Sequence, residues 1–265
     1  MIVKQGEYFI SNRQYHSHPA ISSTGFKYFL SDCPAKYQDY LKRNKGVSGI
    51  KKQKDEYAEG TALHIRILEP EKFNNEVVEQ PEDIEKRSGA RWESFLRDNY
   101  DKCVLRRGGI EKIEDMAKAW QYDGHSLAMS LIREDGPVEV SYFWIFDGIM
   151  TKVRPDKINH TRNLIIDLKS TKSASINSFR RDVRRYHYDL SAILYKRGYK
   201  AVTGNDYDFV WIAQEKEKPY RIAVYAPGED MIELGEEKLK IAHENYSRCM
   251  ETGLFPGYPN EITEL

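Results

Sequence analysis

Three side chains in the second half of the sequence could together cleave a phosphodiester bond. Asp156 ends one apolar segment, and Asp167 and Lys169 stand two residues apart in the next, LIIDLK. Because side chains at i and i+2 lie on one face of a strand, Asp167 and Lys169 are expected to project together. If the two segments are neighbouring strands, the three groups converge. Two carboxylates can then hold a hard cation such as Mg²⁺, and the lysine can orient a water or help it lose a proton.

The segments that carry these side chains belong to a predicted sheet. Residues 139–146 are rich in β-branched and aromatic side chains, Asp147-Gly148 is a hairpin turn signal, and residues 149–156 return as the partner strand. The later elements are a strand at 164–169, a helix at about 175–200, strands at 208–214 and 220–226, and a helix at about 230–252. Asp-x-Lys by itself is explained equally by a surface salt bridge, so this order of elements is what favours a metal site.

The first half of the sequence is predicted to be mainly helical. Helices are expected at about 24–43 with a break near Pro34, at about 57–68, and at about 111–134. With the strands that follow, this order predicts an α/β fold in which a mixed central β-sheet is flanked by helices. We expect a single domain over 1–265, with a helical N-terminal part at 1–135 and a β-sheet catalytic core at 136–265.

Two further side chains are candidate metal ligands. His64 stands four residues after Gly60 on a predicted helix, so the missing side chain of the glycine could let another element approach beside the imidazole. A histidine in such an apolar stretch is more often packed in a core, and both interpretations stay open at this point. Glu139 begins the first strand of the hairpin and could supply a further carboxylate. Its alternative is a polar residue that only marks a strand end.

The formal net charge is zero, but the charges are segregated along the chain. Residues 41–54 hold six Lys or Arg and no acid, and residues 172–200 hold eight Lys or Arg against two acids. Within the second stretch, two i, i+4 pairs of arginines are expected on one helix, namely Arg180, Arg181, Arg184 and Arg185. These arginines are candidate contacts to DNA phosphates, with a subunit interface or a solvated face as the alternatives.

The composition argues against several other classes of protein. Mean hydropathy is −0.70 and no apolar run approaches the ~18 residues of a membrane helix, so we expect no membrane contact and a cytoplasmic location. The three cysteines, Cys33, Cys103 and Cys249, cannot supply the four thiolates of an iron–sulfur nuclease. The sequence has no GxxxxGK loop, which argues against an ATP-driven motor.

At Pro155-Asp156 and Asp167-x-Lys169 the chain resembles the PD-(D/E)XK nuclease superfamily, which implies a restriction-endonuclease-like core. It is also similar to the phage RecE family, called exonuclease VIII, and this resemblance spans nearly the whole chain from residue 6 onward. The segments that carry it are GEYFISNRQYHSHPAISSTGF (6–26), GTALHIRILEP (60–70), VEVSYFW (138–144), VRPDKI (153–158), IIDLKSTK (165–172) and YHYDLSAILYKRGY (186–199).

The RecE resemblance implies an activity and partners. It implies a Mg²⁺-dependent exonuclease, with Mn²⁺ able to substitute, that degrades linear double-stranded DNA from its 5′ ends. It further implies processive action by a homo-oligomeric ring, such as a tetramer, in a bacterial or phage-infected cell. The 3′ single-stranded tails would pass to a single-strand annealing partner in phage-type DNA recombination. The residues themselves leave two alternatives open: a restriction-like endonuclease with the same metal site, and a non-catalytic DNA-binding module with a degenerate site.

The resemblance also implies roles for the candidate site residues. It assigns metal binding to Asp156 and Asp167, and it places Lys169 at the position of the catalytic lysine. In related RecB-like nucleases a histidine at the position of His64 is a metal ligand, which favours ligation over core packing. Glu139 is then the candidate for a further carboxylate, bound to the metal or to a water.

One position on the helix after the lysine strand departs from the family pattern. Tyr195 matches a family tyrosine and is a candidate DNA contact together with the four arginines. It shares a helical face with Tyr188 and Tyr199, which is more typical of a core than of a DNA-binding surface. The family has a glutamine four residues before this tyrosine, where the chain has Ser191. This departure puts the usual hydrogen bonding of the motif in doubt without affecting the metal ligands.

Overall fold

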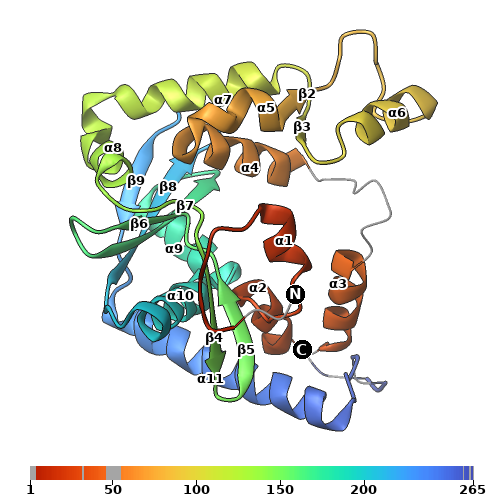
Figure 1. The fold of residues 1–265 in the computed structure, drawn as a ribbon, viewed down its shortest axis with the longest axis vertical. Helices are drawn as coiled ribbons and strands as arrows, with labels where there is room; N and C mark the ends of the chain where they lie inside the picture. The colour runs from red at the N-terminus through yellow and green to blue at the C-terminus, as the bar shows by residue number, and fades with distance from the viewer. Residues whose placement is uncertain (1–3, 32, 46–54, 259, 263, 265) are drawn as a thin grey trace.

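The computed structural model describes residues 4–31, 33–45, 55–258, 260–262 and 264 of the chain. Its centre is a four-stranded sheet in the order β6-β7-β8-β9 (Figure 1). These strands are β6 (Lys157–Asn159), β7 (Leu164–Thr171), β8 (Asp208–Glu215) and β9 (Ile222–Tyr225). β7 and β8 pair in parallel, whereas β6 and β9 pair antiparallel at the two edges, so the sheet is mixed.

A second sheet extends the structure beyond β6. It has the order β1-β4-β5 and contains β1 (Gly6–Tyr8), β4 (Ser141–Phe146) and β5 (Ile149–Val153), all antiparallel. Asp147 and Gly148 join β4 to β5 with φ angles of 45° and 83°, the left-handed backbone that a tight hairpin needs. An isolated bridge between Val138 and Lys157 connects the segment before β4 to β6. A short parallel pair, β2 (Val77–Glu79) and β3 (Cys103–Leu105), stands apart from both sheets.

Helices cover the four-stranded sheet on both sides (Figure 1). One side is covered by α10 (Tyr188–Thr203) and α11 (Glu229–Thr252). The other side is covered by α4 (Asp55–Leu68), α7 (Gly109–Lys118) and α8 (Ser126–Arg133). The other α-helices are α1 (Asn12–Ser17), α2 (Ser23–Lys27), α3 (Ala35–Lys45), α5 (Phe73–Glu76), α6 (Ala90–Asp98) and α9 (Ile176–Arg185). Short 3₁₀ turns are η1 (Tyr28–Leu30), η2 (Pro70–Lys72), η3 (Ala119–Gln121) and η4 (Asp123–His125).

Strand β7 separates two hydrophobic cores. Ile165 packs into the core formed with α10 and α11, whereas Ile166 and Leu168 pack into the core formed with α4, α7 and α8. Because side chains alternate along a strand, Asp167 and Lys169 project on the same side as Ile165. The sequence prediction that these two groups share a face therefore agrees with the structure.

The predicted α/β fold, a mixed sheet flanked by helices, is confirmed. Two predicted helices are each divided. The stretch expected at 111–134 is interrupted by η3 and η4, and the stretch expected at 175–200 is interrupted at His187, whose left-handed φ of 51° ends the helical path. The segment expected to be helical at 1–135 also contributes strands β1, β2 and β3. Within the described residues, no helix combines the length and apolar character that a membrane crossing requires.

Candidate metal centre

Three of the candidate ligands meet beside the end of β5. His64, Glu139 and Asp156 each offer one ligand atom, and these atoms all lie within 4.8 Å of one another. His64 comes from α4, Glu139 from the segment before β4, and Asp156 from the link between β5 and β6. One imidazole and two carboxylates form a donor set that suits a divalent cation such as Mg²⁺ or Mn²⁺, so these residues fit a metal ion.

Asp156 is positioned by β7, although the preceding strand β5 does not pair with β7. The condition that 149–156 and 164–169 are neighbouring strands is not met, because β5 pairs with β4 and the short strand β6 pairs with β7. Asp156 nevertheless reaches β7, since its Oδ2 accepts a hydrogen bond from the Leu168 amide at 2.6 Å. Its Oδ1 lies 3.4 Å from His64 Nδ1. One carboxylate oxygen is thus fixed by the sheet and the other faces the proposed metal site.

His64 lies on the side of α4 that faces β7. A Cβ built on Gly60 would lie 3.6 Å from Ser170 Oγ of β7, an ordinary contact, so the glycine is where the helix and the strand approach. Burial lowers the pKa of His64, but the carboxylate of Asp156 raises it more, and the net pKa is above the usual value. The raised pKa reflects the negative charge beside the imidazole, which has to be in its neutral form before it can ligate a metal.

Glu139 is held by its backbone and by Arg154. It has a φ of 52°, which is uncommon for a residue with a side chain, and its amide donates to the Asp156 carbonyl at 3.1 Å. Arg154 Nε lies 2.8 Å from the Glu139 carbonyl oxygen and 3.0 Å from its Oε2. Burial and the nearby Asp156 raise the pKa of Glu139 to about 7. A divalent cation beside the two carboxylates would relieve this repulsion.

Asp167 and Lys169 form an ion pair next to these three ligands. Lys169 Nζ lies 2.5 Å from Asp167 Oδ2, and Asp167 is only 3% exposed. Burial lowers the pKa of Lys169, but Asp167 and Asp156 raise it more, so the net pKa lies above the usual value. The ammonium group is therefore charged at neutral pH. Asp167 is not one of the three residues whose ligand atoms cluster, although burial and the nearby Asp156 raise its pKa.

A second lysine near Lys169 was not expected from the sequence. Lys27 of α2 places its Nζ 5.4 Å from the centre of the Tyr188 ring, and Lys169 Nζ lies 5.3 Å from the same centre. Burial and the neighbouring charge of Lys169 lower the pKa of Lys27 to about 8. No sequence motif pointed to Lys27, because it lies more than a hundred residues before the other groups. Only the packing of α2 against α10 brings it to the site.

Tyr195 and Ser191 lie on α10 below this cluster. Tyr195 is half-buried and packs edge-on against Phe209, with ring centres 6.2 Å apart. Burial raises its pKa well above the usual value, and the carboxylates of Asp167 and Asp156 raise it further. The ring thus belongs to the packing around the carboxylates. Ser191, at the position of the family glutamine, donates through its hydroxyl to the His187 carbonyl at 3.4 Å in its own helix.

The arginines of α9 lie on the surface, unlike the buried groups of the metal centre. Arg180, Arg181, Arg184 and Arg185 are exposed, and none of the ion pairs among the described residues includes them. The buried face of the same helix carries Phe179 and Val183. Most of the other predicted basic segment, residues 46–54, lies outside the described residues.

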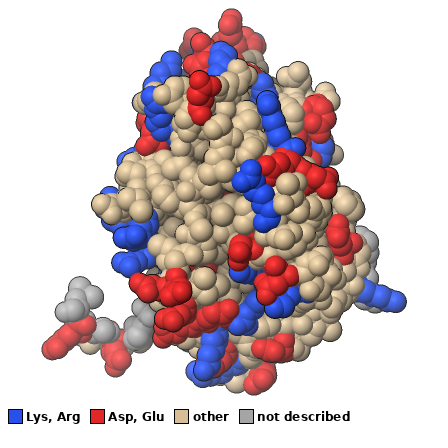
Figure 2. Space-filling view, turned by 90° about the vertical axis from the view of Figure 1, so that its left-hand side faces the viewer, with Lys and Arg blue, Asp and Glu red and all other residues tan. Residues whose placement is uncertain are grey.

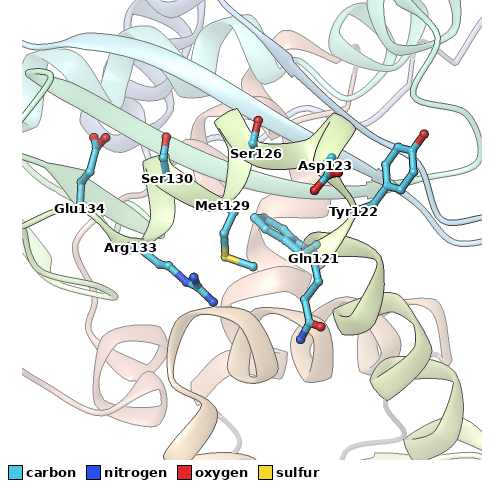
Figure 3. A pocket seen from close by; sticks show the side chains of 9 residues that line it. Gln121, Tyr122, Asp123, Ser126, Met129, Ser130, Arg133 and Glu134 are labelled. Carbon is cyan, nitrogen blue, oxygen red and sulfur yellow. The ribbon is translucent and has the colours of Figure 1, made fainter.

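Two other parts of the surface are the face shown in Figure 2 and the pocket shown in Figure 3. The face in Figure 2 carries acidic and basic side chains side by side around a largely uncharged middle. The pocket in Figure 3 is built from η3, η4 and α8, with Tyr122, Met129 and Arg133 in its lining. None of the predicted site residues lines this pocket. The carboxylates, the lysine and the arginine-bearing helix therefore remain the best candidate site.

Comparisons with known proteins give a family and a fold. Residues 22–264 match the model of a PDDEXK-like domain of unknown function (DUF3799). A candidate exonuclease from Eubacterium rectale has a similar structure, with a TM-score of 0.66, 14% sequence identity, and 97% of this chain and 95% of that chain covered. A phage-related exonuclease from Haemophilus somnus 129PT gives a TM-score of 0.37 at 14% identity, with 89% and 97% covered. No curated protein matches the chain.

Proposed function

The chain belongs to the family of the PDDEXK-like domain, and from that premise we propose that it is a Mg²⁺-dependent deoxyribonuclease acting as a 5′-to-3′ exonuclease on linear duplex DNA. The observation that carries this proposal is the convergence of His64, Glu139 and Asp156 beside the ion pair of Asp167 and Lys169. These groups supply both a cation site and a fixed ammonium group, the two requirements of metal-assisted phosphodiester hydrolysis.

In the proposed reaction the residues of the site have different roles. When bound, a divalent cation polarises the phosphate and makes a water molecule more acidic. His64, Glu139 and Asp156 would hold that cation. Lys169 stays protonated at neutral pH because Asp167 and Asp156 raise its pKa, so its role is to stabilise negative charge on the phosphate and to orient water. Asp167 keeps the ammonium group in place and adds negative charge beside the cation.

The exposed arginines of α9 would bind the DNA backbone. They follow β7 in the chain, so the helix that carries them begins only a few residues after Lys169. Guanidinium groups without acidic partners can contact phosphates without first breaking an ion pair. Such contacts give affinity that depends on salt and hardly on sequence, as an enzyme that degrades any duplex end requires.

The choice of exonuclease over endonuclease rests on the RecE resemblance. On the same basis we propose processive digestion by a homo-oligomeric ring, with the 3′ tails passed to a single-strand annealing protein. The zero net charge supports enclosure, because a neutral chain has little long-range attraction to DNA. Several basic helices facing one channel would slow dissociation of the duplex without tight binding by any one subunit.

Digestion of end-labelled DNA tests this function. Linear duplexes labelled at one 5′ end or one 3′ end, and a covalently closed circle, are incubated with Mg²⁺ or with EDTA, and an Asp156→Asn variant serves as the matched inactive control. We expect early release of the 5′ label, late release of the 3′ label, no cut in the circle, and no reaction in EDTA. Nicking of the circle as fast as linear DNA is degraded would establish the endonuclease instead. DNA binding without any metal-dependent cleavage would establish the binding module.

A further inference from the structure

At the junction between α9 and α10, one tyrosine stands on each side of a residue with left-handed backbone angles. His187 has φ 51° and ψ 48°, so it turns the chain out of the helical path between Tyr186 and Tyr188. A left-handed conformation costs free energy in a residue with a side chain, and it sets the directions in which its neighbours project. Tyr188 is half-buried, whereas Tyr186 is 46% exposed.

These two rings connect the surface to Lys169. The Tyr188 ring centre lies 5.3 Å from Lys169 Nζ and 5.6 Å from the Tyr186 ring centre. The two ring planes are tilted by 31°, and the half-buried ring of Tyr188 beside the lysine is followed by the exposed ring of Tyr186. Since stacked nucleotides rise by about 3.4 Å each, the exposed ring is within a few nucleotides of a phosphate held at Lys169.

The surroundings of Tyr186 are cationic. The Arg185 guanidinium lies 5.5 Å from the centre of its ring, and Arg181 and Arg184 on the same helix are exposed and without acidic partners among the described residues. An exposed aromatic side chain is by itself ordinary. An exposed ring bordered by unpaired cations and leading to a phosphate-cleaving site is the combination that single-stranded nucleic acid recognises, because bases stack on the ring while phosphates meet the cations.

We propose that Tyr186 is a stacking site for an unpaired nucleobase of the DNA strand being cut, with Arg185 and Arg181 contacting the adjacent phosphates. This inference rests on the proposed nuclease function and adds a substrate requirement to it. The strand reaches the metal centre with a base within a few nucleotides of the scissile phosphate already out of the duplex. Ends that are frayed or carry a short unpaired 5′ tail are therefore better substrates than fully paired blunt ends.

A second exposed tyrosine provides a matched control. Tyr122 is 54% exposed and has the Arg221 guanidinium 4.6 Å from its ring centre, so it reproduces the exposure and the cationic neighbour of Tyr186. It lines the pocket of Figure 3, which contains none of the metal-centre residues. Replacing Tyr122 by Ala therefore removes an equivalent side chain from a surface without a proposed role.

The test compares Tyr186→Ala, Tyr186→Phe and Tyr122→Ala on short duplexes with an unpaired 5′ tail. A base that stacks away from the reacting atoms is bound equally in the ground and transition states, so its loss raises KM and leaves kcat unchanged. We expect KM to rise about tenfold in Tyr186→Ala and to stay near the wild-type value in Tyr186→Phe and Tyr122→Ala. An abasic nucleotide at one of the first three positions should raise the wild-type KM similarly and should add nothing to Tyr186→Ala.

A binding measurement in EDTA separates this inference from the nuclease proposal. With 2-aminopurine at the same three positions, stacking on Tyr186 quenches its fluorescence in the wild type and in Tyr122→Ala but not in Tyr186→Ala. Quenching without any cleavage in Mg²⁺ would overturn the nuclease function and leave the stacking site. Cleavage with equal KM in Tyr186→Ala and Tyr122→Ala, and with no quenching that depends on Tyr186, would overturn the stacking site and leave the nuclease.

Discussion

The metal centre and the arginine face of α9 differ in whether their charged side chains form ion pairs. Around the metal centre each of the three carboxylates has a partner of opposite sign: Asp156 faces His64, Glu139 faces Arg154, and Asp167 faces Lys169. On α9, four exposed arginines have no acidic partner in the described part of the chain. The difference follows from burial, because an unpaired charge is costly inside a protein and nearly free in water.

This contrast separates two functions that the sequence presents close together. Paired, buried groups keep fixed positions and shifted pKa values, which chemistry requires. Unpaired, exposed groups are free to bind a polyanion. Substitutions in the metal centre should therefore change both the rate and the stability of the fold, and substitutions on α9 should change only the binding of DNA.

The largest effect is expected from loss of a carboxylate at the metal centre. Asp156→Asn keeps the shape of the side chain and loses the charge that attracts the cation, and Asp167→Asn loses the partner of Lys169. Either substitution should lower cleavage at least ~10³-fold, because a bound cation supplies several kcal/mol of transition-state stabilisation. Single-turnover cleavage at saturating Mg²⁺ measures this. A wild-type rate in either variant would show that the substituted residue is not needed for cleavage.

Lys169→Ala is expected to lower both activity and stability. Loss of the ammonium group should decrease the cleavage rate by about 10²- to 10³-fold. It also leaves the buried Asp167 without its ion-pair partner, so unfolding in EDTA should become easier by roughly 3 kcal/mol. Urea denaturation with and without Mn²⁺ checks the second effect, because a cation should restore part of the loss. Unchanged stability in EDTA would show that Lys169 does not offset the cost of burying Asp167.

Lys152 is a third case, a buried lysine whose neighbours are carbonyl oxygens and not carboxylates. It is 4% exposed, and its Nζ lies 2.5 Å from the Tyr15 carbonyl oxygen and 2.8 Å from that of His18. Burial lowers its pKa from 10.5 to about 8. Between these two pH values the unfolded chain binds more protons at this position, so the contribution of Lys152 to stability rises with pH in that window.

The measurement is the free energy of unfolding of the wild type minus that of Lys152→Met from pH 7.5 to 10.5. We expect this difference to be flat below pH 8 and to grow by about 3 kcal/mol in favour of the wild type by pH 10.5. Tyrosines that ionise at high pH affect both proteins and cancel in the difference. A difference that stays constant would mean that folding does not lower the pKa of Lys152.

The smallest effect is expected on the exposed face. Replacing Arg181 and Arg185 by Ala should leave stability unchanged and should reduce the slope of log K against log salt by roughly two phosphate contacts. The matched control replaces Arg91 and Arg97, two exposed arginines of α6, by Ala. DNA affinity of catalytically inactive protein at several salt concentrations gives both slopes. Equal slopes for the two double variants would assign the α9 arginines to a solvated face or to a subunit interface.

The sequence allowed the sheet and the catalytic strand to be predicted because both depend on local patterns. The alternation in LIIDLK placed Asp167 and Lys169 on one face, and Asp147-Gly148 placed the hairpin turn. Strand β6 was missed because three residues directly after Asp156 are too short to show a period. It is nevertheless the element that pairs with β7, and Asp156 directly precedes it.

Other parts of the site depend on contacts between distant segments. Glu139 was predicted as a candidate further carboxylate, with a polar strand end as the alternative, but its orientation could not be predicted, because it comes from the positive φ and from Arg154. Lys27 carried no signal, since its place near Lys169 follows from packing of α2 on α10. The division of the helix at His187 was missed for a similar reason, because a left-handed histidine leaves the hydrophobic pattern on either side intact.

The most direct test of the metal centre is calorimetric titration of the protein with Mn²⁺. The three ligands cluster within 4.8 Å, so we expect one high-affinity site in the wild type, at least tenfold weaker binding in His64→Ala and Glu139→Gln, and none in Asp156→Asn. Tyr122→Ala, changed on a distant surface, should bind as the wild type does. Equal affinity and stoichiometry in all five proteins would contradict the assignment of His64, Glu139 and Asp156 as ligands.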